Sequence, residues 1–217
     1  MTRPPRTRTT VRRLPDKQVL DRSALDAVLD AALVVHVAVA DETGQPFVLP
    51  LGFARDRDRL IVHGSTASRT FRLLAAGAPS CATATIVDGV VVARSQFESS
   101  YRYRSAMVLG TFEALHGNAK REALALLGAR LLPGIDGRRP PSDQEVAATA
   151  VLALPLDEWS VKIAAGDPED NPADLDRPVW AGVIPLQHVW GEPIDAPDLL
   201  GGHTAPAAVL GWPQGRA

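Results

Sequence analysis

The chain has 217 residues, a formal net charge of −2, and a composition that is 46% hydrophobic and 22% charged. This composition is that of an ordinary globular protein, with enough length for one large or two small domains, and not that of a disordered chain. The small net charge gives no reason to expect a nucleic-acid partner. The longest apolar run, residues 31–40, is too short to cross a membrane.

The N-terminus is basic, with Arg3, Arg6, Arg8, Arg12 and Arg13 and no acid among them. Such a run predicts a disordered, solvated arm over residues 1–13. No apolar signal segment follows it, and the single cysteine cannot form an internal disulfide. We therefore expect a cytoplasmic protein.

The first predicted elements are a helix and an antiparallel meander. Apolar residues at helical spacing predict a helix over residues 23–32, with Ser23 as its N-cap. Three β-rich runs follow, separated by polar turns at residues 43–45 and 56–58. The predicted strands are 33–40, 46–54 and 59–63.

After Gly64 the pattern becomes helical over residues 65–76 and then returns to strands. Residues 80–87 and 90–95 are β-rich and are separated by Asp88-Gly89, a dipeptide typical of two-residue hairpin turns. The elements predicted next are a strand at 105–115, a helix at 118–132 with Asn118 as a possible cap, a short helix at 142–150 and a strand at 151–165.

The C-terminal part is expected to contain a polar loop at 166–177 and one or two strands within 179–190. Residues 191–217 are rich in proline and glycine and are predicted to form a tail or a draped loop. Six or more antiparallel strands with helices between them imply a barrel or a sandwich. No Gly-x-Gly-x-x-Gly motif occurs, which disfavours a dinucleotide-binding Rossmann domain.

One stretch, residues 63–69, combines several groups that suit a phosphate ester. Ser65 and Ser68 offer hydroxyls, Arg69 offers a guanidinium, and a helix beginning there would add free N–H groups. Gly64 would let the backbone approach the ligand closely. The alternative is that a serine only caps the helix and that Arg69 is a surface residue.

A second cluster alternates aromatic and basic residues, from Tyr101 to Arg104. Tyrosine rings can stack on a planar ligand, and arginine can bind phosphate through two parallel hydrogen bonds. The same alternation also describes a solvated edge strand.

The histidines do not form a metal site by spacing. His36 lies in an apolar strand and is expected in the core or in an interface. His116, His188 and His203 are scattered, and one cysteine, Cys81, cannot complete a tetrahedral zinc set.

Several segments follow one another in a characteristic order. They are Arg12-Arg13-Leu14-Pro15, the helix start at Asp21-Arg22, PFVLP at 46–50, LIVHGS at 60–65 with ASR at 67–69, VDGVVVARS at 87–95, YRSAMV at 103–108 and PVWAGVIP at 178–185. In this order they resemble the pyridoxamine 5′-phosphate oxidase-related flavin-binding family, in particular its nitroimidazole-reductase-like branch. The resemblance extends from Arg12 to Trp190.

The resemblance implies a mainly β (α+β) fold: a six-stranded antiparallel split β-barrel with flanking helices, over residues 14–190. It also implies a homodimer with FMN at the subunit interface. The phosphate would lie at Ser65, Ser68 and Arg69 after Gly64. The other residues implied near the cofactor are Leu49, Pro50 and Leu51 beside the isoalloxazine ring, His63 as a catalytic candidate, and Tyr103, Arg104, Ser105, Lys162 and Trp180. For Trp180 the alternative is a tryptophan that packs in the barrel.

The function implied is an FMN-dependent oxidoreductase that reduces a small electron-poor compound of the nitroaromatic type, with the redox chemistry carried by the flavin. One alternative is a non-catalytic flavin- or haem-binding storage or sensor protein, with His36, His63 or His116 as axial ligand. Another is a deazaflavin-dependent reductase, whose cofactor has a longer acidic tail. The tail lacks the arginine and histidine pattern of true pyridoxamine-phosphate oxidase, so vitamin B6 oxidation is not expected.

Overall fold

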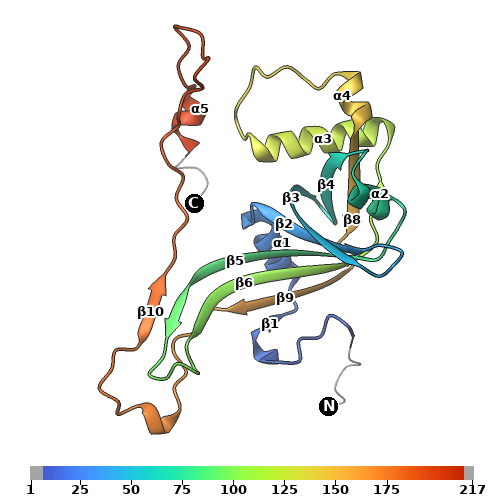
Figure 1. Ribbon diagram of the computed structural model, residues 1–217. Coiled ribbons are helices and arrows are strands. Elements are labelled where there is room, and N and C mark those ends of the chain that lie inside the picture. Colours follow the sequence, from blue (N-terminus) through green and yellow to red (C-terminus); the bar gives the residue numbers. More distant parts are fainter. Residues whose placement is uncertain (1–6, 213–217) are drawn as a thin grey trace.

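The structure, a computed structural model, describes residues 7–212 and is dominated by one antiparallel sheet (Figure 1). The strand order is β1-β9-β6-β5-β2-β3-β4-β8-β7, and β10 pairs with β5 outside this path. The strands are β1 Gln18–Val19, β2 Val34–Ala40, β3 Pro46–Asp56, β4 Arg59–Ser65, β5 Ser80–Val92, β6 Ser100–Gly110, β7 Glu113–Ala114, β8 Thr149–Pro155, β9 Glu158–Ala164 and β10 Gly182–Pro185. The mainly β, antiparallel fold class predicted from the sequence is confirmed.

Five helices accompany the sheet: α1 Arg22–Ala31, α2 Arg69–Ala75, α3 Gly117–Leu131, α4 Asp143–Ala148 and α5 Ala207–Leu210. Pro15–Lys17 and Pro172–Asp174 form short 3₁₀ turns. Within residues 7–212, the structure contains no helix of the length and apolarity needed to span a bilayer.

The main core lies inside the curved sheet, against α1. Leu25 and Leu29 of α1 are fully buried there, and so are Val35 and Val37 of β2. Because alternate residues of β2 point inward, His36, which stands between Val35 and Val37, lies on the outer face and is exposed. His36 is therefore not a core residue.

A second apolar cluster covers the outer face of β3, β4 and β8. Ala123 and Leu127 of α3 pack on Ala54, Ile61 and Val151 of these strands. This part of the sheet is thus buried on both faces, which explains the continuous apolar runs in β4 and β8. Figure 1 shows α3 lying across these strands, with α4 above it.

The predicted hairpin at Asp88-Gly89 is wrong. Residues 80–92 form one continuous strand, and Asp88 is the extra residue of a bulge between Val87 and Gly89. Gly89 is required here for another reason, because a Cβ on it would lie 2.6 Å from the carbonyl oxygen of Ile184 in β10. The Asp88-Gly89 dipeptide, which is typical of a turn, thus lies at a bulge in β5 where β10 pairs with this strand.

Other element boundaries also differ from the prediction. β6 begins at Ser100 and includes the Tyr101–Arg104 alternation, and residues 149–164 form two strands instead of one. The N-cap of α1 is Asp21, whose side chain accepts from the Ser23 N–H. His116, not Asn118, is the N-cap of α3. The short helix α4 was correctly predicted, and Ser142 and Glu145 form its capping box.

The C-terminal segment after β10, residues 186–212, is called the strap. It extends away from the barrel and carries α5 (Figure 1), and the Trp190 and Trp212 rings meet edge to face at 6.1 Å between centroids. At the other end, residues 7–13 lie against β9, where Arg8 pairs with Glu158. The remaining parts of the predicted arm and tail, residues 1–6 and 213–217, lie outside the described residues.

Gly64 in β4 is constrained by packing, which gives a stability prediction. A Cβ at this position would overlap the ring of Phe71, which is itself buried in the core. Gly64→Ala is expected to lower the free energy of unfolding by about 1–3 kcal/mol, because the ring must move in a packed interior. Urea unfolding measures the change.

Gly128→Ala is the matched control. Gly128 lies within α3 and has no atom within 4 Å of the added Cβ. This substitution should stabilise by about 0.5–1 kcal/mol through helix propensity. Equal effects of the two substitutions would contradict the packing argument.

Candidate cofactor-binding site

The predicted phosphate-binding residues lie where β4 ends and α2 begins. The helix begins only at Arg69, so the predicted start at residue 65 is wrong, and Ser65 belongs to the strand. Ser65 Oγ accepts from the Ala67 N–H at 3.1 Å, and Ser68 Oγ accepts from the Phe71 N–H at 3.4 Å. Both hydroxyls therefore order the turn, and each retains capacity for a further hydrogen bond.

Arg69 is exposed and is held by an aromatic ring. Its guanidinium lies 3.9 Å from the centroid of the Phe47 ring in β3, a cation–π contact that orients the side chain. The positive charge of Arg69 also contributes to the lowered pKa of Asp41, although the main cause is the hydrogen bond from Thr43. Arg69 thus presents a fixed positive charge beside the two serines.

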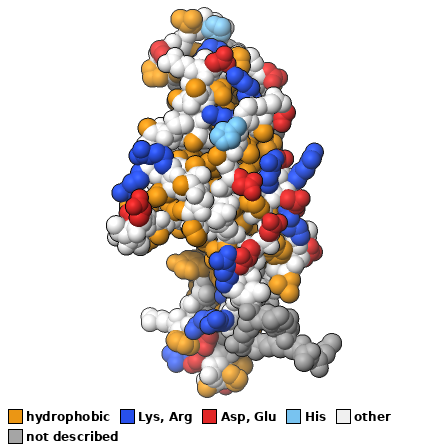
Figure 2. All heavy atoms as spheres, turned by 90° about the vertical axis from the view of Figure 1, so that its right-hand side faces the viewer, with side chains coloured by type: hydrophobic (Ala, Val, Ile, Leu, Met, Phe, Trp, Pro, Cys, Tyr) orange, Lys and Arg blue, Asp and Glu red, His pale blue; other side chains and the backbone are white. Residues whose placement is uncertain are grey.

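Figure 2 shows the side of the molecule that lies at the right in Figure 1. On this face the charged side chains of both signs are interspersed with apolar ones, with no continuous patch of one sign among the described residues. Local recognition of one anionic group by Arg69 therefore fits this face better than a broad electrostatic surface.

A second group of predicted residues lies on β6 and β9. Ser105 is directly opposite Lys162 in the ladder. The Lys162 amine donates a hydrogen bond to the Arg13 carbonyl at 3.2 Å, so this amine is bonded to the N-terminal segment. Arg104 donates from Nε and Nη2 to the Asp88 carboxylate at 2.8 and 2.7 Å. Arg104 is therefore a partner of the β5 bulge.

The remaining predicted residues lie elsewhere in the chain. Leu49, Pro50 and Leu51 are in β3, opposite β2. β3 and β6 are separated by β2 and β5, three spacings of about 4.8 Å each. Trp180 precedes β10 and is 63% exposed. Within one chain the predicted residues thus form separate groups, although His63 and Arg104 line one cavity.

A cavity of about 1520 Å³ lies on the outer face of the sheet, and the sequence analysis did not predict it. Its floor includes His63 of β4, Gly52 of β3, Val34 of β2 and Val87 of β5. Its other walls are formed by α3, through residues such as Leu127, and by the strap. The lining is mainly apolar, and typical ligand pockets are about 300–1,000 Å³, so the cavity is large enough for a sizeable planar ligand.

Gly52 shapes the floor of this cavity. A Cβ built on it would meet nothing within 4 Å, so the strand offers an open, flat position where a ring can approach the backbone. Gly52 is directly opposite Val34 in the ladder. The cavity floor is therefore both flat and held by backbone hydrogen bonds.

His63 is the predicted site residue that contacts this cavity and a second one. The second cavity has a volume of about 370 Å³ and is lined by His63, Leu124, Arg139 and Glu145 among others. The pKa of Glu145 is lowered to about 2, mainly by its hydrogen bond with Arg139. Neither His36 nor His116 lines these two cavities.

A polar cluster lies at another wall of the large cavity, and Arg104 is its only member that was predicted from the sequence as a site residue. It consists of Asp88, Arg104 and His188, all of which line the cavity. The backbone N–H of Leu186 donates to the Asp88 carbonyl at 3.0 Å and fixes the start of the strap. The hydrogen bond from Arg104 lowers the pKa of Asp88, and the charge of His188 adds to this effect.

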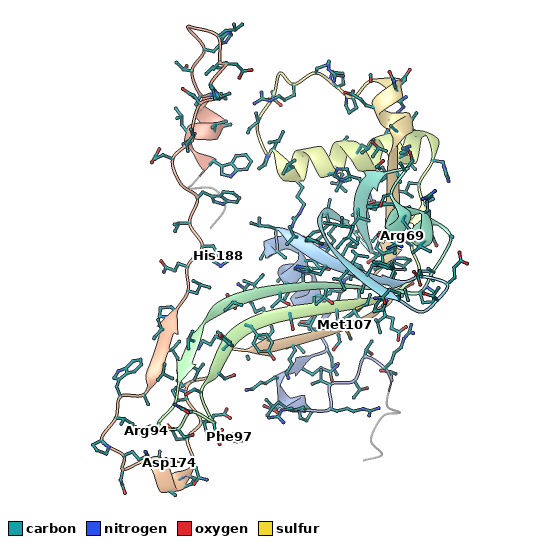
Figure 3. All side chains as sticks on the ribbon, in the orientation of Figure 1. Arg69, Arg94, Phe97, Met107, Asp174 and His188 are labelled. Atoms are coloured by element: carbon teal, nitrogen blue, oxygen red, sulfur yellow. The ribbon has the colours of Figure 1, made fainter. Side chains whose placement is uncertain are left out.

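Figure 3 shows His188 on the strap and Arg69 at the opposite side of the molecule. The cluster with His188 and the turn with Arg69 are therefore two distinct places at which an anionic group could be held.

The comparison with family models matches residues 21–163 to the family described as pyridoxamine 5′-phosphate oxidase. No curated protein matches the chain. The resemblance inferred from the sequence motifs is thereby confirmed at the level of the family.

Several solved structures are similar. The FAD and haem binding protein from Mycobacterium smegmatis is 45% identical, with 90% of this chain and 96% of that chain covered and a TM-score of 0.86. The flavocytochrome Anf3 from Azotobacter vinelandii is 36% identical, with coverages of 94% and 95% and a TM-score of 0.88. A putative 5-nitroimidazole antibiotic resistance protein from Bacteroides thetaiotaomicron shares the fold at 23% identity, coverages of 67% and 86%, and a TM-score of 0.57.

The Asp88–Arg104 pair gives a prediction about pH. Arg104→Gln removes the main cause of the lowered Asp88 pKa, so that pKa should rise toward its ordinary value of 3.8. Because the folded-state pKa is lowered, the pair stabilises the fold above that value, by about 0.2–1 kcal/mol for a partly exposed pair. The contribution is lost as the pH falls through the lowered pKa.

An NMR titration of the Asp88 carboxyl carbon measures the shift directly. Urea unfolding should show a difference between wild type and Arg104→Gln near neutral pH that shrinks in acid. An Asp88 pKa that does not change in the variant would refute the assignment.

Proposed function

The chain belongs to the pyridoxamine 5′-phosphate oxidase-like family of flavin-binding proteins, and on this basis we propose that it binds a flavin and a haem and passes electrons between them. The observation that carries the haem part is the large apolar cavity with His63 in its floor. Two relatives that are more than 30% identical along most of their length support the combination of a flavin with a haem. One binds FAD and haem, and the other is a flavocytochrome.

The cavity suits a porphyrin in size and chemistry. Its volume of about 1520 Å³ exceeds that of ordinary ligand pockets, and its lining includes leucines of α3 such as Leu127 together with Val34 and Val87 of the floor. Gly52 leaves open space where a side chain would otherwise block a flat ring. The residues present therefore fit a large apolar planar group.

His63 is the residue that would hold the haem iron. Three histidines were considered from the sequence. His36 is exposed on the outer face but does not line the cavity, and His116 is the N-cap of α3 and does not line it either. His63 does line the cavity. Its strand is paired with β3 on one side and β8 on the other. A ligand on such a rigid ladder is held more accurately than His188, which lies on irregular backbone.

The flavin is proposed to bind with its phosphate at Ser65, Ser68 and Arg69. These residues offer two hydroxyls and a fixed guanidinium at the end of the strand that carries His63. Placing both cofactors near β4 brings them within one neighbourhood, which favours electron transfer. The sequence motifs favoured FMN, and the M. smegmatis relative binds FAD; mass analysis of the extracted cofactor distinguishes the two.

A homodimer is proposed to complete the flavin site. In one chain Leu49–Leu51 and the Tyr103–Ser105 segment are three strand spacings apart, so a second copy is a simple way to bring such groups onto one ligand. The region of β5 and β6 beyond the bulge also exposes apolar side chains, with Phe97 87% and Trp180 63% exposed. Burial of these side chains would favour association.

The chain's own contribution to the reaction is binding, orientation and exclusion of water. A bound flavin supplies two-electron and one-electron chemistry, and a bound haem supplies one-electron chemistry. Arg69 would balance the phosphate charge, His63 would set the position of the iron, and α3 with the strap would cover the apolar ring.

A flavin reductase acting on a small electron-poor compound is the second candidate. The observation that favours it is the cavity of about 370 Å³ beside His63, which is the size of a small organic ligand site. Turnover of a nitroaromatic compound by the flavin-loaded protein without haem would support this function.

The haem proposal predicts a specific effect of His63→Ala. The wild-type protein as isolated or reconstituted should show a Soret band of a histidine-ligated haem, because His63 binds the iron. The variant should lose this signature, and added imidazole should restore it by filling the space left by the ring. Absorption spectroscopy measures both.

His36→Ala is the control, because His36 lies on the outer face but does not line the cavity. It should leave the spectrum unchanged. Loss of the histidine signature in this variant but not in His63→Ala would refute the assignment of His63.

The flavin proposal predicts that Arg69→Ala weakens flavin retention by about ten- to one hundredfold, since a charge-assisted hydrogen bond contributes about 1.5–3 kcal/mol. Fluorescence titration with FMN and FAD measures the dissociation constants. Arg72→Ala, one turn further along α2 and also exposed, is the control. Unchanged affinity in the Arg69 variant would remove the phosphate-site assignment.

A further inference from the structure

We propose that Arg104 and His188, oriented by Asp88, bind the carboxylate groups of the porphyrin and so fix the direction in which it lies in the large cavity. This inference rests on the proposed haem binding and names residues for a second contact with the same ligand. It starts from one feature, a polar cluster in the otherwise apolar lining.

The cluster joins three elements at one point. Asp88 is the bulge residue of β5, Arg104 lies on β6, and His188 lies on the strap just after Leu186, whose N–H is bonded to the Asp88 carbonyl. The Asp88 carboxylate accepts two hydrogen bonds from Arg104. All three side chains line the same cavity, and Arg104 first and then His188 lower the pKa of Asp88.

Donors remain for an anionic ligand. Arginine has five N–H donors, and two of those of Arg104 face Asp88, so three can be offered to another acceptor. The imidazole of His188 can donate an N–H in either protonation state. Asp88 neutralises part of the positive charge but orients the guanidinium, as a carboxylate does in a bidentate pair.

The other arginines of the large cavity are more fully engaged than Arg104. Arg55 donates two hydrogen bonds to the Asp30 carboxylate and one to the Arg57 carbonyl, and its Nη1 lies 3.6 Å from a carboxylate oxygen of Asp26. Arg130 donates to the carbonyls at the end of α1, including those of Leu29 and Ala32, and its guanidinium lies over the Phe53 ring. The cluster at the strap is therefore the better place for a carboxylate ligand.

The distance across the floor suits this orientation. His63 lies on β4 and Asp88 on β5, and β3 and β2 lie between them. Three strand spacings amount to about 14 Å. A porphyrin whose iron lies at His63 can extend along the floor, over Gly52 and Val34, and direct its carboxylate-bearing edge toward Arg104 and His188.

The strap also passes close to the end of α3. A Cβ on Gly134, just after α3, would lie 3.7 Å from the Cβ of Ala208 in α5. The strap is thus fixed at the bulge and close to the end of α3.

The test compares metal-free protoporphyrin IX with its dimethyl ester, which lacks free carboxylates and needs no iron ligand. The full-length wild-type protein is expected to bind the free acid at least about tenfold more tightly, because charge-assisted hydrogen bonds are lost in the ester. In His188→Leu the ratio of the dissociation constant of the ester to that of the free acid should fall severalfold. His188→Gln keeps an N–H donor and should retain most of this ratio. Fluorescence titration measures all six affinities.

The outcomes separate this inference from the proposed function. If wild type binds neither porphyrin, haem binding and this inference both fail. If it binds both, but the ratio does not depend on His188, only the inference fails. Loss of the histidine-ligated Soret band in haem-loaded His188→Leu would show that His188 is an iron ligand and would overturn its role at the carboxylates.

A flavin phosphate is the other anionic group that this cluster could recognise. Titration of wild type and His188→Leu with FAD and FMN distinguishes the two sources. Equal flavin affinity in both proteins supports porphyrin carboxylates as the ligand. A drop in flavin affinity with an unchanged porphyrin ratio overturns the proposal.

Discussion

The bulge at Asp88 is the constraint on which the rest of the molecule depends. An extra residue in β5 turns the strand and aims the Asp88 carboxylate at Arg104, which closes a bidentate pair on β6. At the next residue, Gly89 leaves room for the carbonyl of Ile184. The same few residues therefore bend the sheet, admit β10 and hold the strap, so that one wall of the large cavity originates here.

The floor and the roof of that cavity differ in how they are held. The floor consists of paired strands, and His63 lies on β4, which is paired with β3 on one side and with β8 on the other. The roof consists of α3, which packs through Ala123 and Leu127 on the outer sheet face, and of the strap, which is attached at separate points. A ligand held from the floor is thus positioned by the most rigid part of the protein, and the roof can adapt to it.

Local patterns explain which parts of the fold could be predicted. The spacing of Leu25, Val28 and Leu29 indicates α1, and alternating burial in β2 and short polar turns indicate the first meander. The Asp88-Gly89 prediction failed because the same dipeptide serves a bulge when a partner strand and an arginine are present. Neither Arg104 nor Ile184 can be connected to it by local reasoning.

The candidate site shows the same division. The stretch from His63 to Arg69 is contiguous, and its chemistry could be recognised in the sequence. The cavity could not, because it needs residues from five strands, two helices and the strap to come together. His188 is more than a hundred residues from His63 and lies outside any regular spacing, so only the folded chain shows that both line one space.

The position of the strap has a consequence for how the protein matures. The family model ends at residue 163, and β10 and the strap follow it in the chain. During synthesis the strands of the floor and α3 emerge before the wall that carries His188. The proposed haem would therefore meet a floor that is open on one side until the strap has followed.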